Sequence, residues 1–167
     1  LPISLHFDLA KDLPPIEADI SQIEQVVINL VGNSSEAFGM SPGEVFVSTG
    51  SIDESEEQDA ANVLGDAASP GERVFIEVRD TGPGIDDEIL SRVFDPFFTT
   101  KFSGRGLGLP VVLGIVRSHG GALTMDSKVG VGTRIRITLP VMGNTTRPDS
   151  RSRVVALPGK TSGRLLV

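Results

Sequence analysis

The sequence predicts an α/β sandwich, in which a mixed, largely antiparallel sheet of about five strands carries three helices on one face. Strand-like and helical segments alternate along residues 3–140, and glycine- or proline-rich turns separate them. Their order is strand, helix, two strands, two helices and two strands, which suits two packed layers. At 167 residues the chain is long enough to bury a core of its own.

The first part of the chain supplies a strand and a long helix. Residues 3–9 alternate apolar and polar side chains, as a half-buried strand does. Asp19 stands at an expected N-cap, and Gln22, three residues later, completes a capping-box pattern. Apolar residues then recur at helical spacing over residues 20–38, and Gly39 with the turn after it ends this helix.

The rest of the chain supplies the other elements. Residues 51–71 carry six acids and no base, so we expect a solvated loop there. We expect strands over 44–50, 72–79, 122–127 and 133–139, and helices over 86–94 and 107–119.

Charge and composition argue against several classes of protein. The net charge of −7 argues against a nucleic-acid partner, because such a partner calls for a basic surface. No apolar run approaches the roughly 20 residues that span a bilayer, so we expect no direct membrane insertion. The absence of cysteine excludes disulfides and cysteine metal sites, and fits a cytoplasmic location.

Two asparagines of the long helix form the first candidate site. Asn29 and Asn33 lie one turn apart, about 40° from each other around the helix axis, at the margin of the apolar stripe. Their carboxamide oxygens suit a Mg²⁺ ion that is held mostly by phosphates and water. For an isolated pair, local hydrogen bonding at the helix edge is the simpler interpretation.

The second candidate site follows a predicted strand. Asp80 ends that strand, and Gly82 and Gly84 stand on either side of a proline just after it. A carboxylate at this edge can accept from an adenine amino group, and glycines let a flat base approach the main chain. An ordinary Asp-Thr-Gly turn has the same residues, so the motif is only moderately specific.

A third candidate site opens the last predicted helix. Residues 104–109 (Gly-Arg-Gly-Leu-Gly-Leu) place backbone N–H groups at a helix N-terminus, where phosphate binds. The pattern fits neither a P-loop nor a dinucleotide-binding fold. The segment before it, residues 94–101, holds three phenylalanines and ends at Lys101, which is placed to reach a γ-phosphate. We expect Phe94 to pack on the core.

Taken in order, these blocks resemble the catalytic domain of histidine protein kinases, over about residues 3–140. Residues 29–37 resemble that family's N box, 80–85 its first glycine box, 94–101 its F box, 104–109 its second glycine box and 130–133 its closing Gly-Thr element. The amino-acid sequence of the F box and of residues 104–121 is most similar to that of nitrogen-regulator-type and hybrid sensor kinases. The resemblance implies the Bergerat-type ATP-binding sandwich, which type II topoisomerases, mismatch-repair ATPases and heat-shock chaperones share.

The resemblance also implies roles for individual residues. Asn33 would be the main Mg²⁺ ligand with Asn29 assisting, Asp80 would bind the adenine amino group, and Asn33 and Lys101 would be the catalytic pair. Residues 95–106 would form a lid over the triphosphate. The other residues implied to contact ATP are Gly82, Gly84, Ile85, Phe98, Thr99, Thr100, Arg105, Gly106, Leu107, Gly108, Leu109 and Thr133.

One position separates a kinase from an ATPase within this resemblance. The hydrolysing relatives carry a Glu one helical turn before the Mg²⁺-binding Asn, whereas this chain has Asn29, which cannot act as a general base at neutral pH. We therefore expect the chain to bind Mg²⁺-ATP and to donate the γ-phosphate to a histidine. ATP hydrolysis and a degenerate nucleotide-binding interaction module are the alternatives. Arg105 and Pro110 depart from the residues that are usual in the family.

The acceptor histidine is expected on a separate helical phosphoacceptor domain. Neither His6, in a strand, nor His119, at a helix end, has the family's phosphoacceptor context, so we do not expect the chain to phosphorylate itself. A response regulator or receiver domain is the other implied partner, and the chain itself is expected to be a monomer. We expect residues 1–143 to be the catalytic domain, 144–162 a linker and 163–167 the start of a receiver domain.

Overall fold

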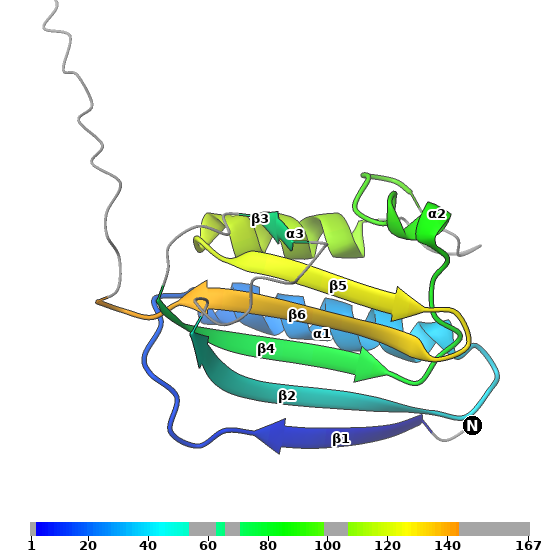
Figure 1. Ribbon diagram of the computed structural model, residues 1–167, viewed down its shortest axis with the longest axis horizontal. Helices are drawn as coiled ribbons and strands as arrows, with labels where there is room; N and C mark the ends of the chain where they lie inside the picture. The colour runs from blue at the N-terminus through cyan, green and yellow to red at the C-terminus, as the bar shows by residue number, and fades with distance from the viewer. Residues whose placement is uncertain (1–2, 54–62, 66–70, 99–106, 144–167) are drawn as a thin grey trace, which may run out of the picture.

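A computed structural model describes residues 3–53, 63–65, 71–98 and 107–143. Within these ranges, six strands form one sheet in the order β1-β2-β4-β6-β5-β3 (Figure 1). β1 is parallel to β2, and every other neighbouring pair is antiparallel. The strands are β1 (Ile3–Leu9), β2 (Gly43–Asp53), β3 (Val63–Gly65), β4 (Glu72–Asp80), β5 (Ala122–Lys128) and β6 (Gly132–Pro140).

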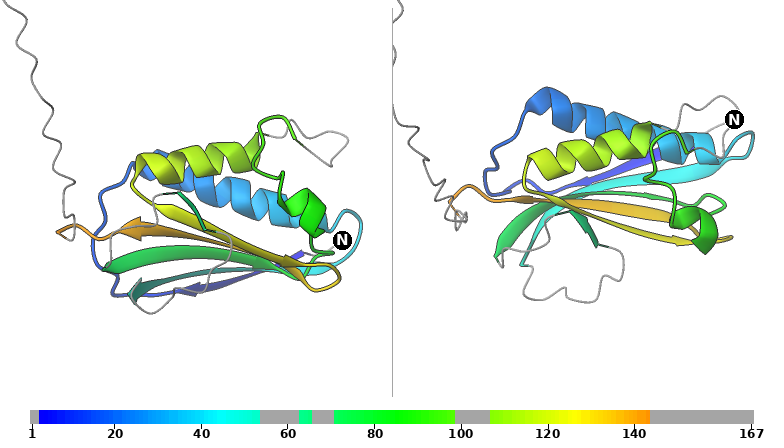
Figure 2. Two further views of the ribbon diagram at one scale, coloured as in Figure 1. Left: turned by 45° about the horizontal axis from the view of Figure 1, so that its top comes forward. Right: turned by 90° about the horizontal axis from the view of Figure 1, so that it is seen from above.

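Helices cover one face of this sheet. α1 (Ile20–Ala37) and α3 (Gly108–Ser118) lie side by side on it, and α2 (Asp87–Leu90) is a short helix at the end where the β5–β6 hairpin turns (Figure 2). The predicted α/β sandwich is confirmed. Side chains with no solvent exposure come from both layers, namely Val26, Leu30, Val112 and Val116 from the helices and Val45, Leu123 and Ile137 from the sheet.

The strand set differs from the prediction after β2. The sequence predicts a solvated loop over residues 51–71, but β2 continues to Asp53 and β3 lies inside this segment, so the sheet has six strands rather than about five. β2 continues because β4 runs beside it as far as Glu72, opposite Asp53, and backbone pairing needs no apolar side chains. Leu64 of β3 packs against the core. Residues 54–62 and 66–70 of the predicted loop lie outside the described ranges.

Most other predicted boundaries agree with the structure within one or two residues. The helix predicted over residues 86–94 is the exception, because α2 ends at Leu90. Tighter turns follow it, since the N–H of Arg92 donates to the carbonyl of Ile89, three residues back, at 2.9 Å. No described helix is both long and apolar enough to cross a bilayer.

β1 has the predicted bounds but not the predicted burial. Leu5, Phe7 and Leu9 are exposed by 45%, 63% and 55%. Leu5 and Phe7 lie opposite the buried Val45 and Val47 of β2, so they face the helix-covered side of the sheet. β1 is nevertheless an edge strand, and none of the described helices covers it (Figure 1). The alternation of apolar and polar residues predicted the strand correctly, but it could not show that no described helix packs over β1.

The start of α1 is attached to the end of α3. Asp19 is the predicted N-cap, and its Oδ1 accepts from the N–H groups of Ser21, at 2.9 Å, and Gln22, at 3.2 Å. Only this half of the predicted capping box forms, because the Asp19 N–H donates to Nε2 of His119, at 3.1 Å, in place of the Gln22 side chain. Nδ1 of that histidine donates to the Ile115 carbonyl, at 2.8 Å, so its proton is on Nδ1.

Replacing Asp19 with Ala is expected to lower the melting temperature by a few degrees at pH 7, because two backbone N–H groups lose their acceptor. The Ser21 hydroxyl and then the Gln22 N–H hold the pKa of the Asp19 carboxyl below its ordinary value. The stabilisation is therefore complete above the unfolded-state pKa and is lost as pH falls through the lower folded-state pKa. Thermal unfolding should show the two proteins converging below about pH 4. A difference in melting temperature that stays constant down to pH 3 would contradict this account. Asp8→Ala, at another exposed aspartate, is the control.

Candidate functional site

β4 stops at the end of the sheet where the β5–β6 hairpin turns (Figure 1). Several polar groups lie together at this end. Asp80, the last residue of β4, is only 5% exposed. Its Oδ1 accepts from the N–H groups of Gly82, at 2.9 Å, and Thr133, at 3.2 Å. Within the described residues both hydrogen bonds of this carboxylate end on Oδ1, which leaves Oδ2 for a donor from outside the chain.

Two glycines let stretches of backbone meet at this place. Gly84 has φ 72° and Gly132 has φ 135°, a range that disfavours residues with side chains. A Cβ on Gly84 would overlap the carbonyl oxygen of Lys128, and a Cβ on Gly132 would overlap that of Asp80. The turn after Asp80 is thus fixed against the hairpin by direct backbone approach.

Ser127 of β5 joins the same two stretches through its hydroxyl, and it is not among the predicted site residues. Its Oγ accepts from the N–H of Ile85 at 2.8 Å and donates to the Gly132 carbonyl at 3.2 Å. It also lies 2.9 Å from Oγ1 of Thr133, which is its register partner across the hairpin. That cross-strand position next to a predicted site residue is the signal that could have identified it.

The second part of the site lies between α1 and α3. Asn29 and Asn33 are both half-buried. A Cβ on Gly108 would lie 3.4 Å from Nδ2 of Asn33, so the first residue of α3 is next to this side chain. α3 has no side-chain cap, and the N–H groups of Gly108 and Leu109 have no acceptor within the helix. Carboxamide oxygens and helix N–H donors therefore lie together, which suits a cation bound to an anion.

In the phenylalanine-rich segment, one phenylalanine packs against the core and the others lie nearer the protein surface. Phe94 packs against the core, as expected. Phe98 is half-buried, and the guanidinium carbon of Arg92 lies 4.5 Å from the centre of its ring. Phe97 is 76% exposed and has φ 69°, which is unusual for a residue with a bulky side chain. No sequence pattern signals this backbone conformation.

The two parts of the site are neighbours. A Cβ on Gly82 would lie 3.7 Å from that of Ala37, one helical turn after Asn33 on α1. The structure thus brings together the described candidates Asn29, Asn33, Asp80, Gly82, Gly84, Ile85, Gly108, Leu109 and Thr133, with Leu107 at the N-cap of α3. Thr99, Thr100, Lys101, Arg105 and Gly106 lie outside the described residues.

Comparison with known proteins agrees with this geometry. The family described as "Histidine kinase-, DNA gyrase B-, and HSP90-like ATPase" matches residues 18–143. The chain belongs to this family. It is 40% identical over 149 residues to the sensor kinase CckA of Brucella abortus, covering 88% of this chain and 15% of that protein. It is 35% identical over 143 residues to the sensory histidine kinase/phosphatase NtrB of Rhizobium meliloti, covering 83% of this chain and 35% of that protein. The chain therefore spans a minor part of the length of these relatives.

Solved structures show the same fold. The catalytic domain of histidine kinase ThkA matches with a TM-score of 0.61 and 30% identity, covering 83% of this chain and 79% of that one. Full-length ShkA, solved in complex with AMPPNP, matches with a TM-score of 0.64 and 28% identity, covering 83% of this chain and 26% of that one. The Bergerat-type sandwich that the resemblance implies is thus confirmed.

Proposed function

We propose that this chain binds Mg²⁺-ATP and donates the γ-phosphate to a histidine on a separate phosphoacceptor domain. The observation that carries the proposal is Asp80, a buried carboxylate with two N–H donors on one oxygen and no hydrogen bond from a described residue on the other. An exocyclic amino group is the ligand part that suits this acceptor, and adenine carries one. The likeness to ShkA, which was solved with an ATP analogue, supports the same ligand.

The phosphates would extend from the Asp80 end toward α1 and α3. The N–H groups of Gly108 and Leu109 would donate to phosphate oxygens, and the amide oxygens of Asn33 and Asn29 would hold Mg²⁺. These hard oxygen ligands fit the ion, which when bound neutralises charge between the phosphate groups. Lys101 and the other residues of 95–106 retain their proposed role as a lid with a γ-phosphate contact.

Transfer rather than hydrolysis follows from the residue at position 29. An asparagine carboxamide has no basic lone pair at neutral pH, so Asn29 cannot take a proton from water. The chain would hold the γ-phosphate in position until an imidazole nitrogen of the acceptor domain attacks the phosphorus and ADP leaves. Catalysis would then consist of positioning and charge neutralisation.

Two measurements test this function. Calorimetry with a non-hydrolysable ATP analogue should show binding that weakens when Mg²⁺ is removed. Incubation with γ-labelled ATP and a purified phosphoacceptor domain should give an acid-labile, alkali-stable label on that domain and none on this chain. ATP turnover by the chain alone would favour the hydrolysing alternative, and a lack of nucleotide binding would favour the degenerate interaction module.

The proposed partners follow from the relatives, which are sensor kinases. We infer a response regulator or receiver domain as the final phosphate acceptor and a cytoplasmic location for the reaction. The linker over residues 144–162 and the receiver start at 163–167 lie outside the described residues and stay predictions. We expect the isolated chain to be a monomer in size-exclusion light scattering.

Ser127→Ala is expected to weaken ATP binding about fivefold, because the Ile85 N–H and the Thr133 hydroxyl both lose a partner beside Asp80. Ser127→Thr keeps the hydroxyl and should restore most of the affinity. Ser118→Ala is the matched control, since that hydroxyl donates to a carbonyl at the far end of α3. Equal affinities for wild type and Ser127→Ala, measured by calorimetry, would remove Ser127 from the site.

A further inference from the structure

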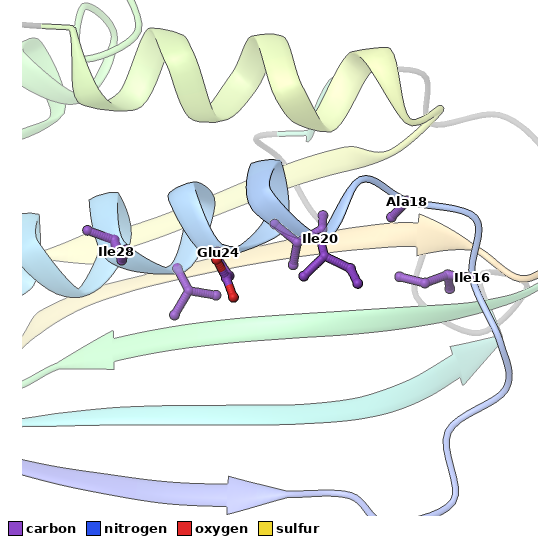
Figure 3. Close-up of a pocket in the computed structure, with 7 residues that line it drawn as sticks. Ile16, Ala18, Ile20, Glu24 and Ile28 are labelled. Carbon is purple, nitrogen blue, oxygen red and sulfur yellow. The ribbon is translucent and has the colours of Figure 1, made fainter.

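An open apolar trough lies beside the N-terminal half of α1, on the side that faces β1 (Figure 3). Its volume is about 500 Å³, and Ile20, Ile23, Val27 and Ile28 of α1 line it together with Glu24. Ile20 is 77% exposed and Ile28 is 70% exposed. Exposed apolar side chains that gather in one place mark an interaction surface.

α1 is apolar over a wider arc than its contact with the sheet requires. Counted at 100° per residue, the arc from the buried Val26 to the exposed Ile28 covers about 200°. A helix that packs on one layer needs a stripe of about 100°. The second half of the arc faces the trough, so α1 presents apolar side chains to something other than its own sheet.

Outside α1, the trough is lined by Ile16 and Ala18 of the connection from β1, and β1 itself extends the exposed apolar surface beyond these lining residues. Leu5, Phe7 and Leu9 are exposed and face the helix-covered side of the sheet. The stretch from Leu5 to Leu9 is about 13 Å long, and the stretch from Ile20 to Ile28 is about 12 Å long. Each of these two apolar stretches therefore matches two to three turns of a helix, and packed helices lie about 8–10 Å apart.

The shape favours a helix over an added strand. A strand that pairs with the edge of β1 would use its backbone groups and leave Phe7 uncovered. A helix placed beside α1 would instead extend the helix layer over β1, which the described helices leave uncovered. Helices that dock in such grooves use apolar anchors at positions i, i+3, i+4 and i+7.

The charges around the trough select a basic helix. Glu24 is among the lining residues, and Asp12 and Glu17 are exposed on the connection between β1 and α1. Lys11 is the only lysine or arginine in residues 1–28, which hold five acids. This balance disfavours an anionic lipid surface and favours lysine or arginine along the flanks of the occupant.

We propose that the trough docks an amphipathic helix of a separate partner protein, with an apolar stripe about three turns long and basic flanks. The trough is independent of the nucleotide site, because Ile28 and Asn33 point about 140° apart around α1. A partner bound there leaves the Asn29 and Asn33 flank of the helix accessible.

The test uses a fluorescein-labelled peptide of about 18 leucines and lysines, with leucine at the anchor positions, and the whole 167-residue chain. Fluorescence anisotropy should show binding that weakens at least about tenfold in the double variant Phe7→Ser/Ile28→Ser. The matched control Met40→Ser/Val131→Ser changes two other exposed apolar side chains and should bind like wild type. Glu17→Gln/Glu24→Gln should weaken binding about threefold and reduce its salt dependence.

Several results would overturn the proposal. One is equal binding by wild type and Phe7→Ser/Ile28→Ser, and another is equal binding of a leucine–glutamate peptide. A dimer of the chain that dissociates in the Phe7→Ser/Ile28→Ser variant would assign the trough to a second copy instead. Binding by this chain but not by a longer kinase that contains it would assign the trough to a helix of the same polypeptide.

Discussion

Asp80→Asn is expected to weaken ATP binding about 100-fold. Asparagine keeps an oxygen that can accept from the N–H groups of Gly82 and Thr133, so the local backbone is retained. Its amide NH2 group then occupies the place of Oδ2. This group is a hydrogen-bond donor, so it cannot accept from the adenine amino group and instead repels it. Calorimetry with a non-hydrolysable analogue measures the loss.

The same variant should change which base is preferred. Guanine carries a carbonyl at the position of the adenine amino group, so wild type should prefer ATP to GTP and Asp80→Asn should narrow that preference. Asp126→Asn is the matched control, because Asp126 is an exposed β5 aspartate whose carboxylate pairs with Arg134, at 2.6 Å. An unchanged ATP affinity in Asp80→Asn, with an unchanged melting temperature, would place the base elsewhere.

Local features of the fold could be predicted from the sequence because neighbouring residues decide them. The bounds of β1 follow from alternation, and the start of α1 follows from Asp19, whose carboxylate accepts from N–H groups two and three residues ahead. The position of Asp80 at a strand end with glycines after it was also predictable, since strand end and turn are adjacent in sequence. These features need no knowledge of the distant chain.

Features that depend on distant segments could not be predicted. The Asp19 N–H donates to His119, 100 residues away, and no local pattern names this partner. Ser127 contacts Ile85 across 42 residues, so its role follows only from the sheet register. The exposure of Phe7 depends on which strands the helix layer covers, and an alternating pattern is the same whether or not a helix lies above it.

Gly132→Ala is expected to destabilise the fold by about 3 kcal/mol, which lowers the melting temperature by roughly 10 °C. Two effects add. The backbone has φ 135°, which an alanine adopts only with strain, and the new Cβ would overlap the carbonyl group of Asp80. Because backbone atoms are on both sides of this contact, no side-chain rotation relieves it.

Gly130→Ala is the control for a positive φ without a close contact. Gly130 also has a positive φ, of 77°, but its Cβ would meet no described atom within 4 Å, so only the conformational cost of about 1 kcal/mol applies. The difference between the two variants therefore measures the close approach of β6 to Asp80 together with the greater backbone strain at φ 135°. Gly132→Ala should also lose ATP affinity in whatever fraction stays folded, because the Thr133 N–H is pushed from Oδ1 of Asp80. Equal melting temperatures for the two variants would mean that the hairpin moves away from β4 without cost, and the rigid backbone contact inferred at this site would then be wrong.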